Sequence, residues 1–118
     1  MSYDISFKVK VDGMDKWVPV GECDANITWN VGDMIRKSTG LEWKNEENNG
    51  LCVDVIPKIV DGLKELLMKP DKYKKYEDID GYGTIKGTID FFITVICDWQ
   101  CFYTCYPNFV PIATFWIE

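Results

Sequence analysis

Residues 84–106 read TIKGTIDFFITVICDWQCFYTCY, and this apolar stretch determines the expected architecture. Its β-branched and aromatic content suits a strand, but a strand of this length would be exceptional in a globular protein. Polar residues recur at every fourth position along it: Lys86, Asp90, Thr94 and Asp98. Residues at that spacing share one narrow stripe of a helix. The stretch therefore predicts a long, nearly buried helix that Pro107 ends.

A second helix is expected before this one, at about residues 54–69. Asp54 is a suitable N-cap, Pro57 falls in the first turn, and Pro70 prevents continuation of the helix. Six apolar residues lie at helical spacing in between: Ile56, Ile59, Val60, Leu63, Leu66 and Leu67. They predict one face packed against a core.

Strands are expected towards both ends of the chain. Residues 3–11 alternate between apolar and polar side chains, and the Asp12-Gly13 turn allows residues 16–20 to return as a hairpin. Residues 110–117 are apolar on both faces, which indicates a strand covered on both sides or an edge strand that meets a partner. Residues 25–29 form a short strand or an extended lead into a helix. The expected fold is α+β, a small antiparallel sheet (N-terminal hairpin plus C-terminal strand) packed against two main helices.

The region between these elements contributes a short helix and a polar segment. Asn30 is a credible N-cap, and Gly40 marks the end of the short helix. Residues 42–50 are mostly charged or amide-bearing, so an exposed loop is expected there. Trp43 lies in this loop and is expected at the surface.

Length and composition narrow the function classes. The 118 residues favour a single domain over 1–118, and the absence of histidine excludes His-based acid–base catalysis and His-containing zinc sites. A net charge of −6 disfavours general nucleic-acid binding, although residues 58–75 hold six lysines against three acidic residues. This basic segment is either a solvated helix face or a local patch for an anion or partner. With no membrane-spanning run and no signal-peptide pattern, we expect a cytoplasmic protein without a membrane partner.

The cysteines favour free thiols. They number five, at positions 23, 52, 97, 101 and 105, and an odd count without a signal peptide is typical of a reducing compartment. Cys97, Cys101 and Cys105 share one face of the long helix, where core packing is expected. A metal or redox role is the alternative, but no fourth ligand is evident. No cofactor is therefore expected.

Two segments place polar groups at the start of a helix, and together they form the predicted binding surface. In an extended segment Asn26, Thr28 and Asn30 alternate with Trp29, while the turn at residues 81–84 carries Tyr82 and ends at Thr84. We expect the two segments to converge, with Trp29 or Tyr82 as the aromatic anchor. The alternative is that both are ordinary helix caps that lie apart. The candidate partner- or ligand-binding residues are Asn26, Thr28, Trp29, Asn30, Arg36, Trp43, Tyr82 and Thr84.

The order of these segments resembles a family of small uncharacterised bacterial and phage proteins. The resemblance lies in the opening Met1-Ser2-Tyr3-Asp4-Ile5, the Asn26-Ile27-Thr28-Trp29-Asn30 segment, the proline-containing helix and the glycine turn before a long helix. The family carries Asn-Ile-Thr-Tyr-Asn at the second of these, so Trp29 replaces a tyrosine here, and Met34 and Ile35 stand at its following aromatic positions. The resemblance implies a cytosolic α+β protein from a microbe or mobile element, and it implies no activity.

These observations favour a non-enzymatic binding protein of bacterial or phage origin that occupies a protein partner, for instance in phage–host conflict. The support comes from the absence of catalytic motifs, the excess of aromatic residues and the twice-apolar final strand, which also indicates a homo-oligomer. The alternative is a sponge that sequesters a nucleotide-type immune signal. In that case the rings at positions 29, 43 and 82 stack on the base, while Arg36 and the helix start at Thr84 bind phosphate. A mimic of nucleic-acid charge is a weaker third possibility, because −6 is a modest charge for that role.

Overall fold

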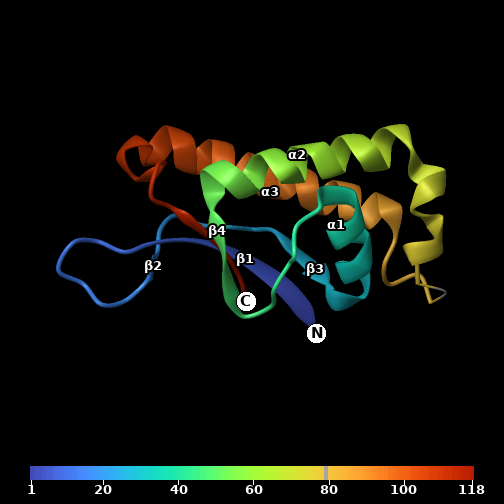
Figure 1. Ribbon diagram of the computed structural model, residues 1–118, viewed down its shortest axis with the longest axis horizontal. Helices are drawn as coiled ribbons and strands as arrows, with labels where there is room; N and C mark the ends of the chain where they lie inside the picture. The colour runs from blue at the N-terminus through green and yellow to red at the C-terminus, as the bar shows by residue number, and fades with distance from the viewer. Residues whose placement is uncertain (79) are drawn as a thin grey trace.

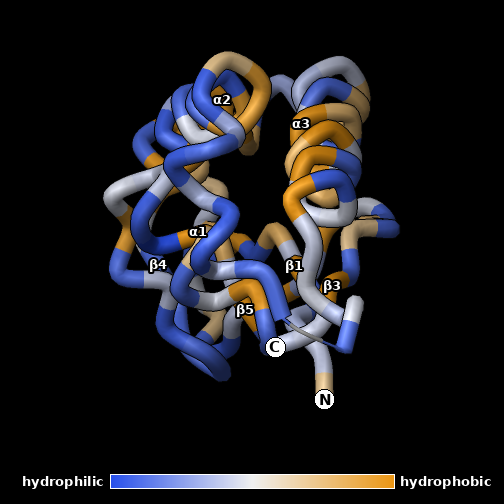
Figure 2. The backbone as a smooth tube through the Cα atoms, turned by 90° about the vertical axis from the view of Figure 1, so that its right-hand side faces the viewer, coloured by the Kyte–Doolittle hydropathy of each residue, from blue (hydrophilic) through white to orange (hydrophobic). Residues whose placement is uncertain are grey.

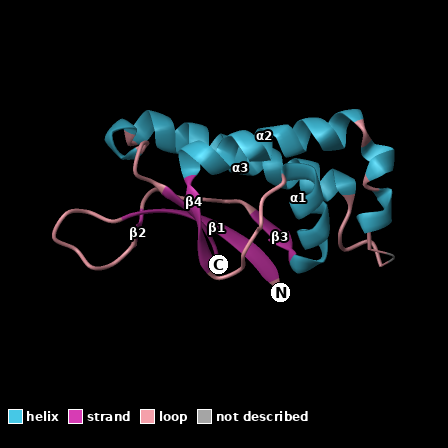
Figure 3. Cartoon of the chain, in the orientation of Figure 1, coloured by secondary structure: helices cyan, strands magenta, loops and turns pink. Residues whose placement is uncertain are grey.

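The structure is a computed structural model that describes residues 1–78 and 80–118. Its elements are β1 (Ser2–Val9), β2 (Val18–Pro19), β3 (Asn26–Thr28), α1 (Gly32–Thr39), β4 (Glu47–Leu51), α2 (Cys52–Met68), α3 (Ile85–Cys105) and β5 (Thr114–Ile117). Short 3-10 turns add Trp29–Val31, Pro70–Lys72, Lys74–Tyr76 and Pro107–Phe109. The long helices α2 and α3 lie on one side of the antiparallel sheet and α1 stands beside β3 (Figures 1 and 3), so the predicted α+β class is confirmed.

The sheet joins the two ends of the chain. Its strand order is β2-β1-β5-β4, and β3 pairs with β1 as well. Phe7 of β1 lies opposite Phe115 of β5, and their rings are 6.1 Å apart at the base of the core. Because β1 and β4 pair with its two edges, β5 is not an edge strand. Of the two alternatives for residues 110–117, the structure therefore shows the strand that is covered on both sides and not the edge strand.

The two long helices cover this sheet as one layer. Figure 2 looks along the molecule and shows α2 and α3 side by side above the strands. Gly62 of α2 lies where this layer meets α1, since an added Cβ would be only 2.5 Å from Thr39 Cγ2 and 3.1 Å from Phe92 Cε2. The helices approach each other closely at this point because glycine has no side chain.

The long helix α3 agrees with its prediction in extent but not in burial. Thr84 is its N-cap and accepts a hydrogen bond from the Gly87 amide, and Lys86 pairs with Asp90 at 3.2 Å. The flank away from the core is exposed at Ile93 and Tyr103, so the helix is not nearly buried. The reason is that α3 covers the sheet from one side and keeps solvent on its other flank. Within the described residues, no helix is both long and apolar enough to cross a bilayer.

Two predicted helix starts are wrong. Helix α2 begins at Cys52, whose amide donates to the Ala113 carbonyl, so Asp54 lies in the first turn and does not cap the helix. Helix α1 follows a 3-10 turn at Trp29–Val31, so Asn30 does not cap it. Its end is confirmed at Gly40, which has the left-handed φ of +75°.

The prediction for residues 42–50 is correct in that most of the segment is exposed, but it is wrong in two respects. Glu47–Leu51 pairs with β5 as strand β4, and Trp43 is only 1% exposed. The Trp43 ring packs edge-on against Tyr3 at 5.6 Å and Phe91 at 5.9 Å. Its backbone turns inward with a φ of +51°, and the Arg36 guanidinium holds this conformation by donating to the Trp43 carbonyl. Trp43 is therefore part of the core and is not available to a ligand.

Candidate binding groove

The two predicted site segments do lie together. An added Cβ on Gly83 would be 3.1 Å from Asn30 Cβ and 3.3 Å from Val31 Cγ1, so the turn packs directly on the start of α1. The Asn30 side-chain amide also donates to Asp78 at 2.6 Å. Trp29 is 37% exposed beside this contact, and Tyr82 is 70% exposed.

The polar groups of this surface bind mostly to one another. Asn26 donates from its side chain to Ser2 Oγ at 3.1 Å and to Asp4 Oδ1 at 2.5 Å. The Trp29 indole donates to the Ser2 carbonyl at 2.8 Å, and Thr28 pairs with Ser2 in the sheet. These bonds tie β3 to β1, so a structural role accounts for them.

The predicted phosphate-binding groups are also engaged. The Glu77 carboxylate accepts from the Ile85 amide at 2.9 Å, which places a negative charge at the start of α3 where an anion was expected. The Arg36 guanidinium donates to the carbonyls of Glu42, at 3.1 Å, and Trp43, at 3.2 Å. The arrangement therefore works against a phosphate at this surface.

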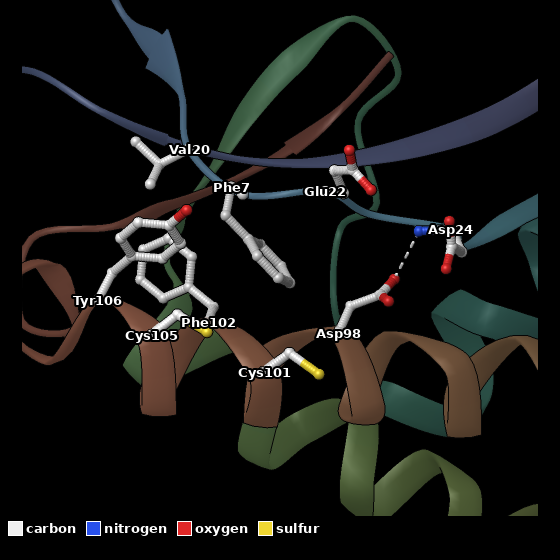
Figure 4. A pocket seen from close by; sticks show the side chains of 10 residues that line it. Phe7, Val20, Glu22, Asp24, Asp98, Cys101, Phe102, Cys105 and Tyr106 are labelled. Carbon is white, nitrogen blue, oxygen red and sulfur yellow. Dashed lines mark hydrogen bonds between the residues drawn. The ribbon is translucent and has the colours of Figure 1, made fainter.

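A second candidate site is a cavity between the C-terminal half of α3 and the connection from β2 to β3. Figure 4 shows this cavity of about 350 Å³ with α3 below and residues 20–24 above. Its aromatic end is formed by Phe102 and Tyr106, and its acidic end by Glu22, Asp24 and Asp98. Phe7, Cys101 and Cys105 complete its walls. We call this cavity the acidic–aromatic groove.

The aromatic end is a packed wall. The Phe102 ring lies 5.5 Å from the Tyr106 ring and stacks on Trp99 at 5.1 Å with an interplanar angle of 12°. Gly21 closes the same end from the opposite side, because an added Cβ would be 3.4 Å from the Tyr106 ring. Its φ of +73° suits glycine. The wall is thus formed by side chains that pack on one another at the C-terminal end of α3.

The acidic end is organised by Asp98. Its Oδ2 accepts from the backbone amides of Asp24, at 3.0 Å, and Ala25, at 3.2 Å, so the side chain ties α3 to the strand connection (Figure 4). Burial raises the pKa of the Asp98 carboxyl, the two amides oppose this shift, and the Asp24 carboxylate adds to it. Among the ion pairs of the described residues, none involves Glu22, Asp24 or Asp98. The groove therefore presents negative charge that its own chain does not neutralise.

The acidic end is not built for a metal. Of the residues that the structure describes, no group of three Cys, Asp or Glu side chains is arranged to hold a metal ion. Its carboxylates act as separate hydrogen-bond acceptors, which suits an organic cation.

The cysteine stripe does not lie in the core: Cys101 and Cys105 line this groove, and Cys97 precedes them by one turn on α3. Cys97, Cys101 and Cys105 are exposed, so the expected core packing is wrong for all three. Cys23 is half-buried and Cys52 is fully buried.

This difference in burial predicts two classes of thiol reactivity. Burial raises the pKa of Cys23 from 9.0 to about 11, and it raises that of Cys52 further. Two pKa units correspond to about 100-fold less thiolate at pH 8 for Cys23, and the thiolate is the reactive form. An Ellman assay on the native protein should therefore show three fast thiols and two slow ones. The guanidinium-unfolded chain is the control, with five equal rates, and five equal rates in the native protein would contradict the prediction.

The sequence indicates which groove residues share a helix face, but it does not indicate how the two sides of the groove come together. Asp98, Cys101, Phe102 and Cys105 follow the spacing of one helix face. The acidic pair Glu22 and Asp24 lies in a connection between strands, and the backbone amides of Asp24 and Ala25 tie this connection to α3 by donating to Asp98. A link across 74 positions has no local signal.

No protein-family model matches the chain, and no curated protein or solved structure matches it. The functional proposal therefore depends on the groove's own residues.

Proposed function

We propose that this chain is a non-enzymatic binding protein that acts by occupying a protein partner, and that the acidic–aromatic groove is the contact surface. The observation that carries the proposal is the combination of aromatic side chains with carboxylates that take no part in the chain's described ion pairs. Aromatic anchors supply most of the binding energy at protein interfaces, and charge complementarity selects the partner.

Contacts that hold two side chains of the groove in place support this proposal. Asp98 is fixed by two backbone amides, and Phe102 is fixed by stacking on Trp99. Groups that are already in place lose little conformational entropy on binding, so more of the contact energy appears as affinity. A bacterial or phage origin, and a role in phage–host conflict, rest on the resemblance of Met1–Ile5 and Asn26–Asn30 alone.

The nucleotide-sponge alternative keeps one supporting observation. Trp29 and Tyr82 are exposed rings on neighbouring segments and are free to stack on a base. Against it, Arg36 is bonded to two carbonyls and Glu77 occupies the start of α3. A thermal-shift screen with cyclic and linear nucleotides tests it, and no shift with any of them removes it.

The partner proposal is tested by comparing groove variants with a control at the other surface. The protein captured by the tagged wild-type chain from a bacterial host is repurified, and its affinity is measured for Asp98→Asn, Tyr106→Ala and Tyr82→Ala. Loss of an interface anchor typically weakens binding by at least about tenfold. We expect that loss for the two groove variants and an unchanged affinity for Tyr82→Ala, whose side chain lies outside the groove.

Asp98→Asn is a conservative change for this purpose. The amide carbonyl of asparagine still accepts from the Asp24 and Ala25 amides while the charge is removed. Thermal unfolding of each variant checks that the fold is retained. The proposal fails if no partner is captured, or if both folded groove variants bind as tightly as the wild type.

A further inference from the structure

We infer that the occupant of the acidic–aromatic groove is an arginine side chain of the partner, with its guanidinium at Asp24 and Asp98 and its aliphatic stem along the rings of Phe102 and Tyr106. This inference rests on the proposed function and names the chemistry that the groove selects. It follows from the volume, the charge and the wall of the groove.

The volume of the groove suits one large side chain. At about 350 Å³ it lies at the lower end of the range for ligand pockets, which is about 300–1,000 Å³. The same volume in liquid water holds about a dozen molecules. The seven heavy atoms of an extended arginine side chain take about half of this space and leave room for bridging water, whereas a folded segment of a partner does not enter it.

The acidic residues of the groove all lie at one end, so that end favours a cation. Glu22, Asp24 and Asp98 lie on the two sides of that end, from the strand connection and from α3 (Figure 4). Both backbone bonds to Asp98 use Oδ2, and no donor to its Oδ1 occurs in the described part of the chain. This oxygen and the Asp24 carboxylate are acceptors for an incoming N–H group.

The separate acceptors at the acidic end favour a guanidinium over an ammonium group. A guanidinium carries five N–H donors in a planar fork and is weakly hydrated, whereas an ammonium is a compact and strongly hydrated charge. The fork can donate to Asp24 and to Oδ1 of Asp98 together, while the stem lies along Phe102, which is one helical turn from Asp98 on α3. Arginine is also among the residues that most often dominate binding energy at interfaces.

The inference is tested with short peptides of known sequence. Acetyl-Gly-Gly-Arg-Gly-Gly-amide is titrated into the ¹⁵N-labelled full chain, alongside matched peptides that carry lysine or citrulline. Citrulline has nearly the shape of arginine without the charge. We expect amide shifts at residues 21–25 and 98–106, millimolar binding of the arginine peptide, and binding of the citrulline peptide at least about tenfold weaker.

Two variants and a control locate the binding. Asp98→Asn and Asp24→Asn should each weaken the arginine peptide several-fold, whereas Tyr82→Ala should not change it. Asp24→Asn leaves the backbone amide that Asp98 accepts from, so it tests charge without touching that bond. Equal binding of the arginine and citrulline peptides overturns the inference, as do amide shifts that lie outside the groove.

The source of the cation is tested separately. Spermidine is titrated under the same conditions, and each arginine of the captured partner is replaced by lysine. The inference requires that one such replacement weakens the complex at least about tenfold and that spermidine binds more weakly than the arginine peptide. If the complex depends on Asp98 but on no arginine of the partner, the arginine inference fails and the proposed function stands. If the complex does not need Asp98 or Tyr106, the proposed function fails as well.

Discussion

Replacement of Trp43 by alanine is expected to lower the free energy of unfolding by about 3–5 kcal/mol, the range for truncation of a buried tryptophan. The side chain is 1% exposed and packs against Tyr3, Phe91 and Phe115, whose ring centres lie 5.6–5.9 Å away. These rings belong to β1, α3 and β5, so the truncation leaves a cavity where three elements meet. Because small domains are stable by only about 5–15 kcal/mol, a loss of this size removes a large part of the total.

The measurement is equilibrium unfolding in urea, with Trp29→Ala as the matched control. Trp29 is 37% exposed, lies 6.1 Å from the Tyr3 ring and donates from its indole to the Ser2 carbonyl. Its truncation removes one hydrogen bond and only part of a buried ring, so it should cost about 1–2 kcal/mol, less than that of Trp43. The assignment of Trp43 to the core fails if its replacement costs no more than that of Trp29.

Replacement of Gly62 by alanine should also destabilise the fold, by about 1–3 kcal/mol, the range for overpacking of a core. At an exposed helical site the same change stabilises by roughly 0.5–1 kcal/mol, because alanine loses less backbone entropy than glycine. Here the added methyl group meets Thr39 Cγ2 at 2.5 Å and Phe92 Cε2 at 3.1 Å. The clash therefore outweighs the gain in helix propensity.

Thr39→Ser provides the rescue for this variant. Serine removes the Cγ2 methyl group and keeps the hydroxyl, which donates to the Ile35 carbonyl at 2.6 Å and accepts from the Leu41 amide. In urea unfolding, the double variant should recover much of the stability that Gly62→Ala loses. A gain in stability for Gly62→Ala alone, or additive losses in the double variant, would contradict the close contact between α1 and α2.

Local periodicity was sufficient to predict the main elements of the fold. The polar stripe from Lys86 to Asp98 identified α3, and the alternation of residues 3–11 identified β1 and the face that it buries. Gly40 marked the end of α1 because only a residue that tolerates positive φ fits there. These signals depend on residues that are close in the sequence, so they can be recognised without tertiary information.

The burial of single residues was less predictable because it depends on contacts between distant segments. Trp43 stands among polar residues, and it is buried because residues 47–51 pair with β5 and hold the segment against the sheet. The cysteines of α3 have the spacing of a packed face but are exposed, and two of them line the open groove. The sequence alone does not say which flank of an apolar helix lacks a neighbour.

The candidate site likewise has one part that the sequence predicted and one part that it did not. The approach of the Gly81–Thr84 turn to Asn30 was predicted from two helix starts, and the segments do lie in contact. The groove was not predicted, since its acidic end needs Asp98 to bond across 74 positions. Helix caps have a local pattern, whereas a cavity exists only where separate elements fail to fill the space between them.

The pairing of β1 with β5 has a consequence for the order of folding. Thr114 donates to the Lys8 carbonyl across 106 positions, and Asp4 and Glu118 exchange two backbone hydrogen bonds. On a ribosome, β1 can pair with β2 and β3 early, but its other edge stays open until nearly all of these residues have been synthesised. Closure of so large a loop is entropically slow, so we expect the sheet to form last and folding to take milliseconds to seconds, although both long helices are local. During that interval the unpaired edge of β1 is the part of the nascent chain most exposed to aggregation, and chaperones would act there.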